Sequence, residues 1–280
     1  MIMKNNRMCI LWVGLMLCCL LLCGCNATTE NRVATDGSTS MEKTIGSLGE
    51  AYMLQHPEVH FTFNPIGSGS GIVAVADGRC DIGLSSRHLS ETEKSRGLCE
   101  TVIAYDGIAV VVHPENPLTS LTMEELAAIY TGEVTDWKEL GVAAGSVVPI
   151  GREAASGTRT GFEEAVDVKE RCRYRQELTS AGDVMTSVSQ NPNAIGYTSL
   201  ASVNESVKVL AVDGVFPTEE SIRSNAYSVQ RPFVLVTRSE GSLSTAAGDF
   251  FDYITSEDAV ELIRRSGVVP TATTEGEEDV

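Results

Sequence analysis

The sequence predicts an α/β protein folded into two lobes, and three features indicate this class. Short apolar segments with strand character alternate with helical patterns over residues 41–270. Two of the strands, around Ile108–Val112 and around Phe233–Val236, are expected to cross between the lobes as hinge strands. Loops rich in glycine and hydroxyl residues follow several strands, at the sheet edge where α/β proteins bind ligands. We therefore expect a small-ligand cleft between the lobes.

The first helix is predicted over residues 41–57. Ile45, Leu48, Tyr52 and Leu54 lie on roughly one helical face, and a proline ends the pattern. The rest of this half follows in order: an alternating strand at 59–66, a short helix at 71–79, a buried strand at 80–86, and a strong strand at 107–117 that breaks at two prolines.

The second half continues the alternation. Its elements are, in order, a helix at 122–132 with a turn at 137–141, a strand at 147–153, a helix, turn and strand within 182–200, a strand at 231–237, and two final helices within 244–270 that stop at a proline. Because the crossing strands make the first lobe discontinuous, we expect lobe 1 to comprise residues 36–113 plus 227–280, and lobe 2 residues 114–226.

Residues 1–25 have the pattern of a secretory signal. Lys4 and Arg7 precede an apolar run of 14 residues that ends at Leu22–Cys25. The run is too short and wrongly flanked for a spanning helix. Its Leu-x-Gly-Cys ending resembles a bacterial lipoprotein box, in which Cys25 becomes the lipidated N-terminus. A plain signal peptide and a buried anchor are the alternatives.

The chain that follows is strongly acidic. Residues 26–35 are polar and without apolar periodicity, so we expect a short tether. The signal holds two basic residues and no acidic ones, so its removal lowers the net charge from −17 to about −19. This charge argues against nucleic-acid binding, which needs a basic surface. An anion would be repelled at long range, and only local, desolvated hydrogen bonds would hold it.

Five of the eight cysteines lie in the signal, which leaves Cys80, Cys99 and Cys172. An exported protein permits disulfides, and Cys80 and Cys99 are the nearest pair in sequence. One cysteine would then be left over, and the sequence does not decide the pairing. The flanking residues show no metal-ligand spacing, so neither a metal nor another cofactor is expected.

Four strand-to-helix turns combine glycine with hydroxyl residues: 36–43, 65–72, 81–89 and 151–164. Glycine lets the backbone approach a ligand closely, and the unpaired N–H groups at helix starts bind anions. The second turn lacks the lysine and spacing of a nucleotide P-loop, and taken alone it is equally consistent with a flexible loop. The four turns together are stronger evidence for a binding site than any one of them.

The fourth turn places a cation just before a helix start: Arg152, then Ser156, Gly157 and Thr158. A guanidinium, hydroxyl groups and free backbone N–H groups together form a seat for an oxyanion. The simpler alternative is an ordinary helix cap, with Thr160 and Glu163 as its capping box.

These motifs together resemble those of a known family. In chain order they are DGSTS, GSGSG, DIGLSSRHL, DGIAVVVHPENP, LAAIYTGEVTDW, REAASGTR, NPNAIGYTSL, RPFVLVT and SGVVP. The set is similar to the phosphate-binding lipoproteins of the Pst ABC transporter and covers nearly all of the chain after the signal. The resemblance implies a type II periplasmic-binding-protein fold that grips dehydrated inorganic phosphate between its lobes. It also implies a monomer, lipid-anchored at Cys25 on the extracytoplasmic face of the bacterial cell membrane, that delivers phosphate to an ABC permease.

The resemblance implies the following ligands, residue by residue: Thr39, Ser40, Ser68, Ser86, Arg152, Ser156, Gly157 and Thr158. Some relatives have an aspartate where Ser86 stands, and that carboxylate accepts the proton of hydrogen phosphate. Here the acceptor must come from elsewhere, and Asp106 is our candidate. An ordinary turn or cap aspartate is the alternative.

Two other functions were weighed. A secreted serine hydrolase or phosphatase would use Ser156 or Ser68 as nucleophile, but none of the four histidines lies in a triad motif, so we expect no enzyme. A binder of another oxyanion, such as sulfate, molybdate or a carboxylate, would use the same loops. The proton acceptor would distinguish phosphate from fully ionised anions.

Overall fold

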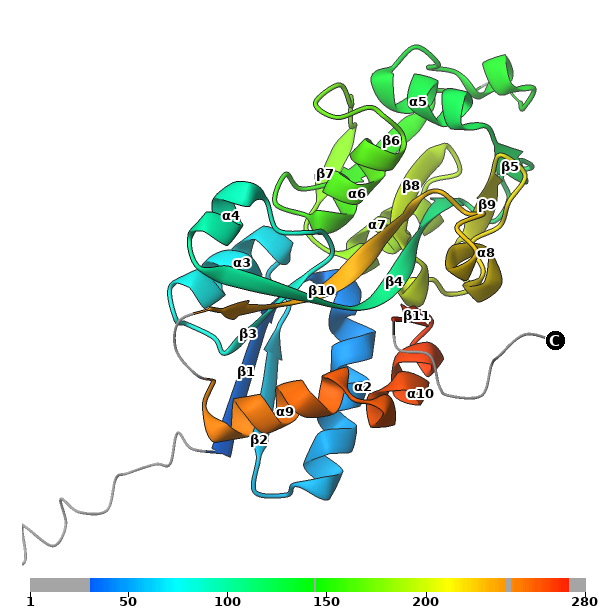
Figure 1. Ribbon diagram of the computed structural model, residues 1–280. Helices are drawn as coiled ribbons and strands as arrows, with labels where there is room; N and C mark the ends of the chain where they lie inside the picture. Colours follow the sequence, from blue (N-terminus) through cyan, green and yellow to red (C-terminus); the bar gives the residue numbers. More distant parts are fainter. Residues whose placement is uncertain (1–30, 144, 240–242, 272–280) are drawn as a thin grey trace, which may run out of the picture.

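The computed structural model describes residues 31–143, 145–239 and 243–271 (Figure 1). The predicted signal, Cys25 and residues 26–30 of the predicted tether lie outside these ranges. Across the described ranges, no helix combines the length and apolar character needed to cross a bilayer. All three cysteines in these ranges are free thiols, with Cys80 buried and Cys99 exposed.

The first lobe is a mixed sheet with strand order β2-β1-β3-β10-β4. Its strands are β1 (Arg32–Gly37), β2 (His60–Asn64), β3 (Ile82–Ser85), β10 (Gln230–Arg238), the first part of β4 (Leu98–Val112), and β11 (Val269–Pro270). Its helices are η2 (Thr39–Met41), α2 (Glu42–Gln55), α3 (Ser68–Ala76), α4 (Glu91–Ser95), α9 (Thr245–Thr255) and α10 (Glu257–Arg265). Strand β1 runs parallel to β2 and β3, so their C-terminal ends meet at one edge.

Alternating residues place a core on each face of this sheet. Phe233 and Leu235 of β10 pack with α2, α9 and α10, whereas Val234 and Val236 pack with α3 on the other face. Gly37 ends β1 with φ +145°, and a Cβ there would lie 2.1 Å from the carbonyl oxygen of Leu84. Only glycine therefore lets β1 turn into η2 against β3.

The second lobe continues from the other half of β4 through β8 and β6 to β7. Its strands are β5 (Ser120–Leu121), β6 (Val148–Arg152), β7 (Gln176–Leu178), β8 (Ala194–Ser199) and β9 (Lys208–Val212). Its helices are α5 (Met123–Thr131), η3 (Trp137–Leu140), α6 (Gly157–Ala165), α7 (Ala181–Ser189), η4 (Leu200–Ser202) and α8 (Glu219–Arg223). Phe162 of α6 stacks on Tyr197 of β8 at 4.0 Å between ring centroids, which fixes α6 on the sheet.

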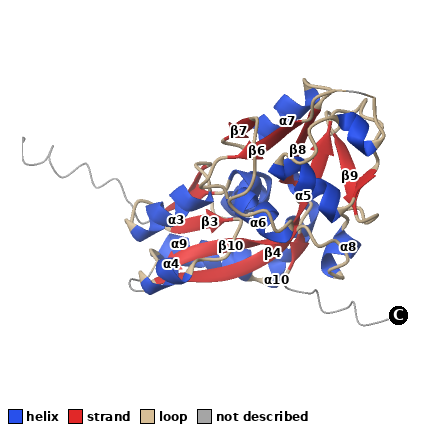
Figure 2. Ribbon diagram, turned by 90° about the horizontal axis from the view of Figure 1, so that it is seen from above, coloured by secondary structure: helices blue, strands red, loops and turns tan. Residues whose placement is uncertain are grey.

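The chain crosses between the lobes at two adjoining points. Strand β4 pairs with β10 up to Gly107 and with β8 from Ile108 onward. The second crossing precedes β10, where the N–H of Ile108 donates to the carbonyl of Val229 at 2.8 Å. Phe233–Val236 lies beyond this crossing, inside the first sheet. Figure 2 shows β4 and β10 side by side below the second lobe.

The crossing expected around Phe233–Val236 is therefore misplaced, and two further sequence predictions need correction. The tether was expected to reach residue 35, but Arg32–Gly37 forms β1, which lies between β2 and β3 in the first sheet. The segment has no long apolar run. It is buried because β2 and β3 pair with it on both sides and because Val33 and Ala34 pack in the cores on the two faces of the sheet. Strand β4 begins at Leu98, well before the predicted start at 107, because its first part pairs with β10 along its length. The lobe boundaries near residues 113 and 226 stay predictions.

Candidate functional site

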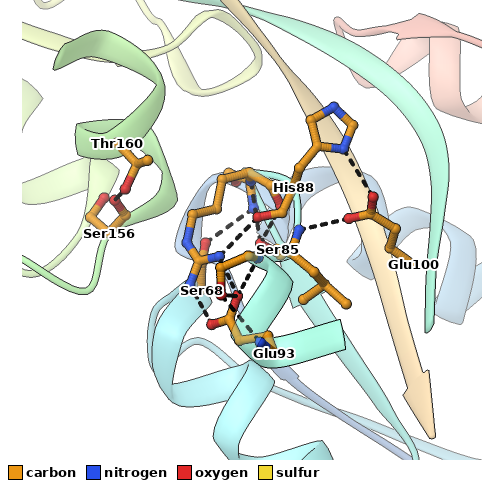
Figure 3. Close-up of polar contacts among 11 residues, drawn as sticks. Ser68, Ser85, His88, Glu93, Glu100, Ser156 and Thr160 are labelled. Carbon is orange, nitrogen blue, oxygen red and sulfur yellow. Dashed lines mark hydrogen bonds and ion pairs between the residues drawn. The ribbon is translucent and has the colours of Figure 1, made fainter. Parts of the chain in front are cut away.

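Four turns meet between the lobes. Three come from the first lobe: the turn from β1 into η2, the start of α3, and the residues after β3. The fourth, from β6 into α6, comes from the second lobe. Figure 3 shows Ser156 and Thr160 at the start of α6 beside the first-lobe cluster that contains Ser68 and Ser85.

Three hydrogen bonds join the lobes at these turns. The hydroxyls of Ser40 and Thr158 lie 3.0 Å apart. Arg152 Nη2 donates to Thr39 Oγ1 at 3.2 Å. The N–H of Gly69 donates to the carbonyl of Ala155 at 3.0 Å. The structure therefore shows the two halves of the site in direct contact.

The first-lobe turns are also hydrogen-bonded to each other through their serines. Ser68 Oγ accepts the N–H of Ser86 at 3.0 Å, and the hydroxyls of Ser38 and Ser86 are hydrogen-bonded. Gly157 faces this cluster, because a Cβ on it would lie 2.6 Å from Ser68 Oγ. Ser38 was not among the predicted ligands, although its place in the DGSTS motif was a signal for it.

Ser156 caps α6 and accepts the N–H of Arg159 at 3.4 Å. The alternative capping box of Thr160 and Glu163 is therefore wrong. The Glu163 carboxylate instead accepts from Arg159 Nε at 2.7 Å and from the Tyr174 hydroxyl at 2.9 Å. These bonds hold the first turn of α6 against the lobe, so its N-terminus points at the site in a fixed direction.

Arg152 ends β6 and is only 1 % exposed. Its Nε donates to the carbonyl of Leu178 at 3.1 Å and its Nη2 to that of Thr179 at 2.8 Å. All its described hydrogen-bond acceptors are uncharged, and Nη1 has no partner. Burial lowers the pKa of this guanidinium, which remains protonated in proteins. A buried cation without a carboxylate partner is a strong site for an anion.

Asp106 lies apart from these turns. In the β4–β10 register it stands opposite Arg231, and its Oδ2 accepts from Arg231 Nη2 at 2.8 Å. Its Oδ1 accepts the N–H of Ala201 at 3.4 Å. Both side chains are almost fully buried, at 0 % and 1 % exposed. Burial raises the pKa of the Asp106 carboxyl, and Arg231 opposes that shift.

Hydrogen bonds pair Thr39 with Arg152, Ser40 with Thr158, and Ser68 with Ser86. Ser156 accepts the N–H of Arg159, and Gly157 lies against Ser68. The described partners of Asp106, Arg231 and Ala201, lie outside this set. Sequence reasoning missed Arg231. Its signal was a charged residue opening an otherwise apolar strand, RPFVLVT.

A cleft of about 890 Å³ opens beside the cluster, and both lobes line it. Ser86 and Arg231 contribute from the first lobe and Thr160 from the second. His88 also lines the cleft, and its half-exposed side chain pairs with Glu100 at 3.3 Å (Figure 3). In the part of the chain that the structure describes, no group of His, Cys, Asp and Glu residues is arranged to hold a metal ion.

A two-lobe α/β protein whose loops converge on a buried, partly unpartnered guanidinium belongs to the class of solute-binding proteins. The particular family follows from the sequence comparison. Residues 26–258 match the family model of the PBP superfamily domain, and the chain belongs to that periplasmic-binding-protein family.

Several relatives are described by the ligand they bind. The chain is 29 % identical over 265 residues to a phosphate-binding protein PstS from Borreliella burgdorferi, covering 90 % of this chain and 95 % of the relative. It is 28 % identical over 239 residues to that of Bacillus subtilis, covering 84 % and 79 %.

Solved structures are similar as well. A Clostridium perfringens protein, described as a phosphate ABC transporter substrate-binding protein and solved with bound phosphate, matches with a TM-score of 0.83 and 37 % identity. The match covers 86 % of this chain and all of that one. An ABC-type phosphate transport receptor from Vibrio cholerae matches with a TM-score of 0.70 and 33 % identity, covering 85 % and 99 %.

Proposed function

We propose that this protein binds inorganic phosphate between its lobes and delivers it to an ABC permease. The observation that carries the proposal is Arg152, a buried guanidinium with an unpartnered Nη1 at the meeting point of four turns. A dianion there satisfies the free N–H and balances the charge. The names of the similar proteins support phosphate as the ligand.

The proposed ligand set has two halves. From the first lobe, Thr39, Ser40, Ser68 and Ser86 supply hydroxyl and backbone donors. From the second, Arg152 supplies the cation, and Ser156, Gly157 and Thr158 supply the start of α6. Because most of these donors are neutral, dehydrated phosphate is held by the number of hydrogen bonds, with one charge-assisted interaction.

Asp106 is not proposed as a direct ligand, since its oxygens are bonded to Arg231 and Ala201. The acceptor was expected to come from a residue other than Ser86, but with Asp106 set aside we propose the Ser86 hydroxyl itself, which can accept a hydrogen bond as well as donate one, as the acceptor for the proton of hydrogen phosphate. The protein performs no chemistry on its ligand. It acts as a monomer, anchored through a lipid on Cys25 at the extracytoplasmic face of the membrane.

The proposal is tested by calorimetric titration of phosphate, sulfate and molybdate into the phosphate-free protein, with and without the substitution Arg152→Ala. Hydrogen bonds to charged groups contribute about 1.5–3 kcal/mol. For Arg152→Ala we therefore expect phosphate affinity to fall by about 10- to 150-fold.

The matched control is Arg79→Ala, which removes an arginine whose side chain is 56 % exposed on the first lobe. It should leave affinity unchanged. Unaltered binding by Arg152→Ala would refute the site. Equal affinity of the wild-type protein for all three anions would favour a general oxyanion binder, and turnover of a phosphoester would favour an enzyme.

A further inference from the structure

Arg231 is a buried cation with spare hydrogen-bonding capacity. Its side chain is 1 % exposed, and only Nη2 has a described partner, the Asp106 carboxylate. Nε and Nη1 are buried without partners. Unpaired N–H groups are costly in an interior, so a guanidinium with two of them indicates an interaction beyond the ion pair.

The position of Arg231 points toward the anion site. A Cβ built on Gly161 of α6 would lie 3.2 Å from the Cβ of Arg231, so this arginine packs under the helix that Ser156 caps. Arg231 also lines the inter-lobe cleft together with Ser86.

Arg231 and Arg152 are close enough to interact electrostatically. Burial lowers the pKa of Arg231 to about 10, Asp106 opposes the shift, and the charge of Arg152 adds to it. Two guanidinium groups near one cleft repel each other, and an anion between them relieves the repulsion.

We propose that Arg231 is a second cation of the anion site, acting from the cleft side, and that the Asp106 carboxylate limits how strongly it acts. This inference rests on the proposed function and adds a residue that determines affinity at the same site. Arg231 attracts the anion through its charge, so it should raise the affinities for sulfate and phosphate by similar factors.

The inference predicts that the substitution Asp106→Asn strengthens anion binding. The variant removes one negative charge but keeps an oxygen that can accept from Arg231. The titration is done at about pH 8, above the pKa of the wild-type Asp106 carboxyl, which burial raises to about 6. The variant should then bind phosphate and sulfate each about tenfold more tightly than the wild type. A proton acceptor for phosphate would behave oppositely, since its loss would weaken phosphate binding and spare sulfate.

The double variant Asp106→Asn/Arg231→Gln removes the cation while leaving an uncharged, hydrogen-bonding pair. We expect its anion affinity to fall below that of the wild type. Asp106→Asn should therefore bind the anion most tightly, the wild type less tightly and the double variant least tightly. This pair avoids a lone buried charge, and thermal unfolding followed by circular dichroism checks that each variant folds.

Glu261→Gln is the matched control, because it also removes one negative charge but from an exposed ion pair with Arg265 on α10. It should change affinity less than twofold. Equal affinities for wild type and Asp106→Asn, or weaker binding by Asp106→Asn, would overturn the role of Arg231 while phosphate binding itself stands. Failure of the wild-type protein to bind phosphate would instead refute the proposed function.

Discussion

Gly157 offers a sharp test of how the lobes meet. It opens α6, and a Cβ there would lie 2.6 Å from Ser68 Oγ, 2.8 Å from the carbonyl carbon of Ser86 and 3.0 Å from that carbonyl oxygen. The Ser68 hydroxyl can rotate away, but the Ser86 backbone cannot move without shifting the turn after β3. Gly157→Ala therefore keeps the lobes apart at the site.

The magnitude follows from the nature of the clash. Overpacking a well-packed contact costs about 1–3 kcal/mol. This cost applies only when the lobes are closed, so it appears in binding, and phosphate affinity should fall about 5- to 150-fold. The clash is absent when the lobes separate. The unfolding temperature of the phosphate-free protein should therefore be unchanged or slightly higher, because alanine favours the helix over glycine.

Calorimetry measures the affinity, and Gly182→Ala supplies the control. Gly182 is also in the first turn of a second-lobe helix, α7, but a Cβ on it meets nothing closer than 3.8 Å. If Gly157→Ala bound phosphate as tightly as Gly182→Ala, the close approach of α6 to the first lobe would not belong to the binding state, and the reasoning would fail.

Two further predictions concern stability and location. Hydrogen bonds from Arg87 lower the pKa of Glu93 from 4.5 to about 2, so this pair stabilises the fold above about pH 4.5 and the stabilisation is lost as the pH falls toward 2. Glu93→Gln should reduce the loss of unfolding free energy between about pH 5 and about pH 3. Urea titrations measure it, and an unchanged pH dependence would contradict this. Cys25→Ser should release the protein from bacterial membranes in fractionation, whereas Cys23→Ser should not, and retention of both variants would exclude the lipid anchor.

Local patterns were sufficient to predict the turns that meet between the lobes. The arginine before Ser-Gly-Thr and the glycine-hydroxyl turns after strands are signals contained in a few consecutive residues, since they depend on helix starts and strand ends. The structure brings those turns together from both lobes. The capping residue of α6 was misplaced by four positions, because both Ser156 and Thr160 fit a cap pattern and only the packed helix chooses between them.

The errors came from long-range pairing. Residues 32–35 of β1 were taken for tether because the strand lacks a long apolar run. Its burial depends on pairing with β2 and β3 and on packing of Val33 and Ala34 with helices later in the chain. Asp106 was expected to face the ligand, but the β4–β10 register sets it against Arg231, 125 residues away in sequence.

The sequence by itself determined the alternation of strands and helices, the acidic charge and the chemistry of each glycine-hydroxyl turn, because these depend on neighbouring residues. Only the tertiary structure decided which buried charges pair. The free energy of an ion depends on the groups that fold around it, so Arg152 is left without a carboxylate while Arg231 acquires one.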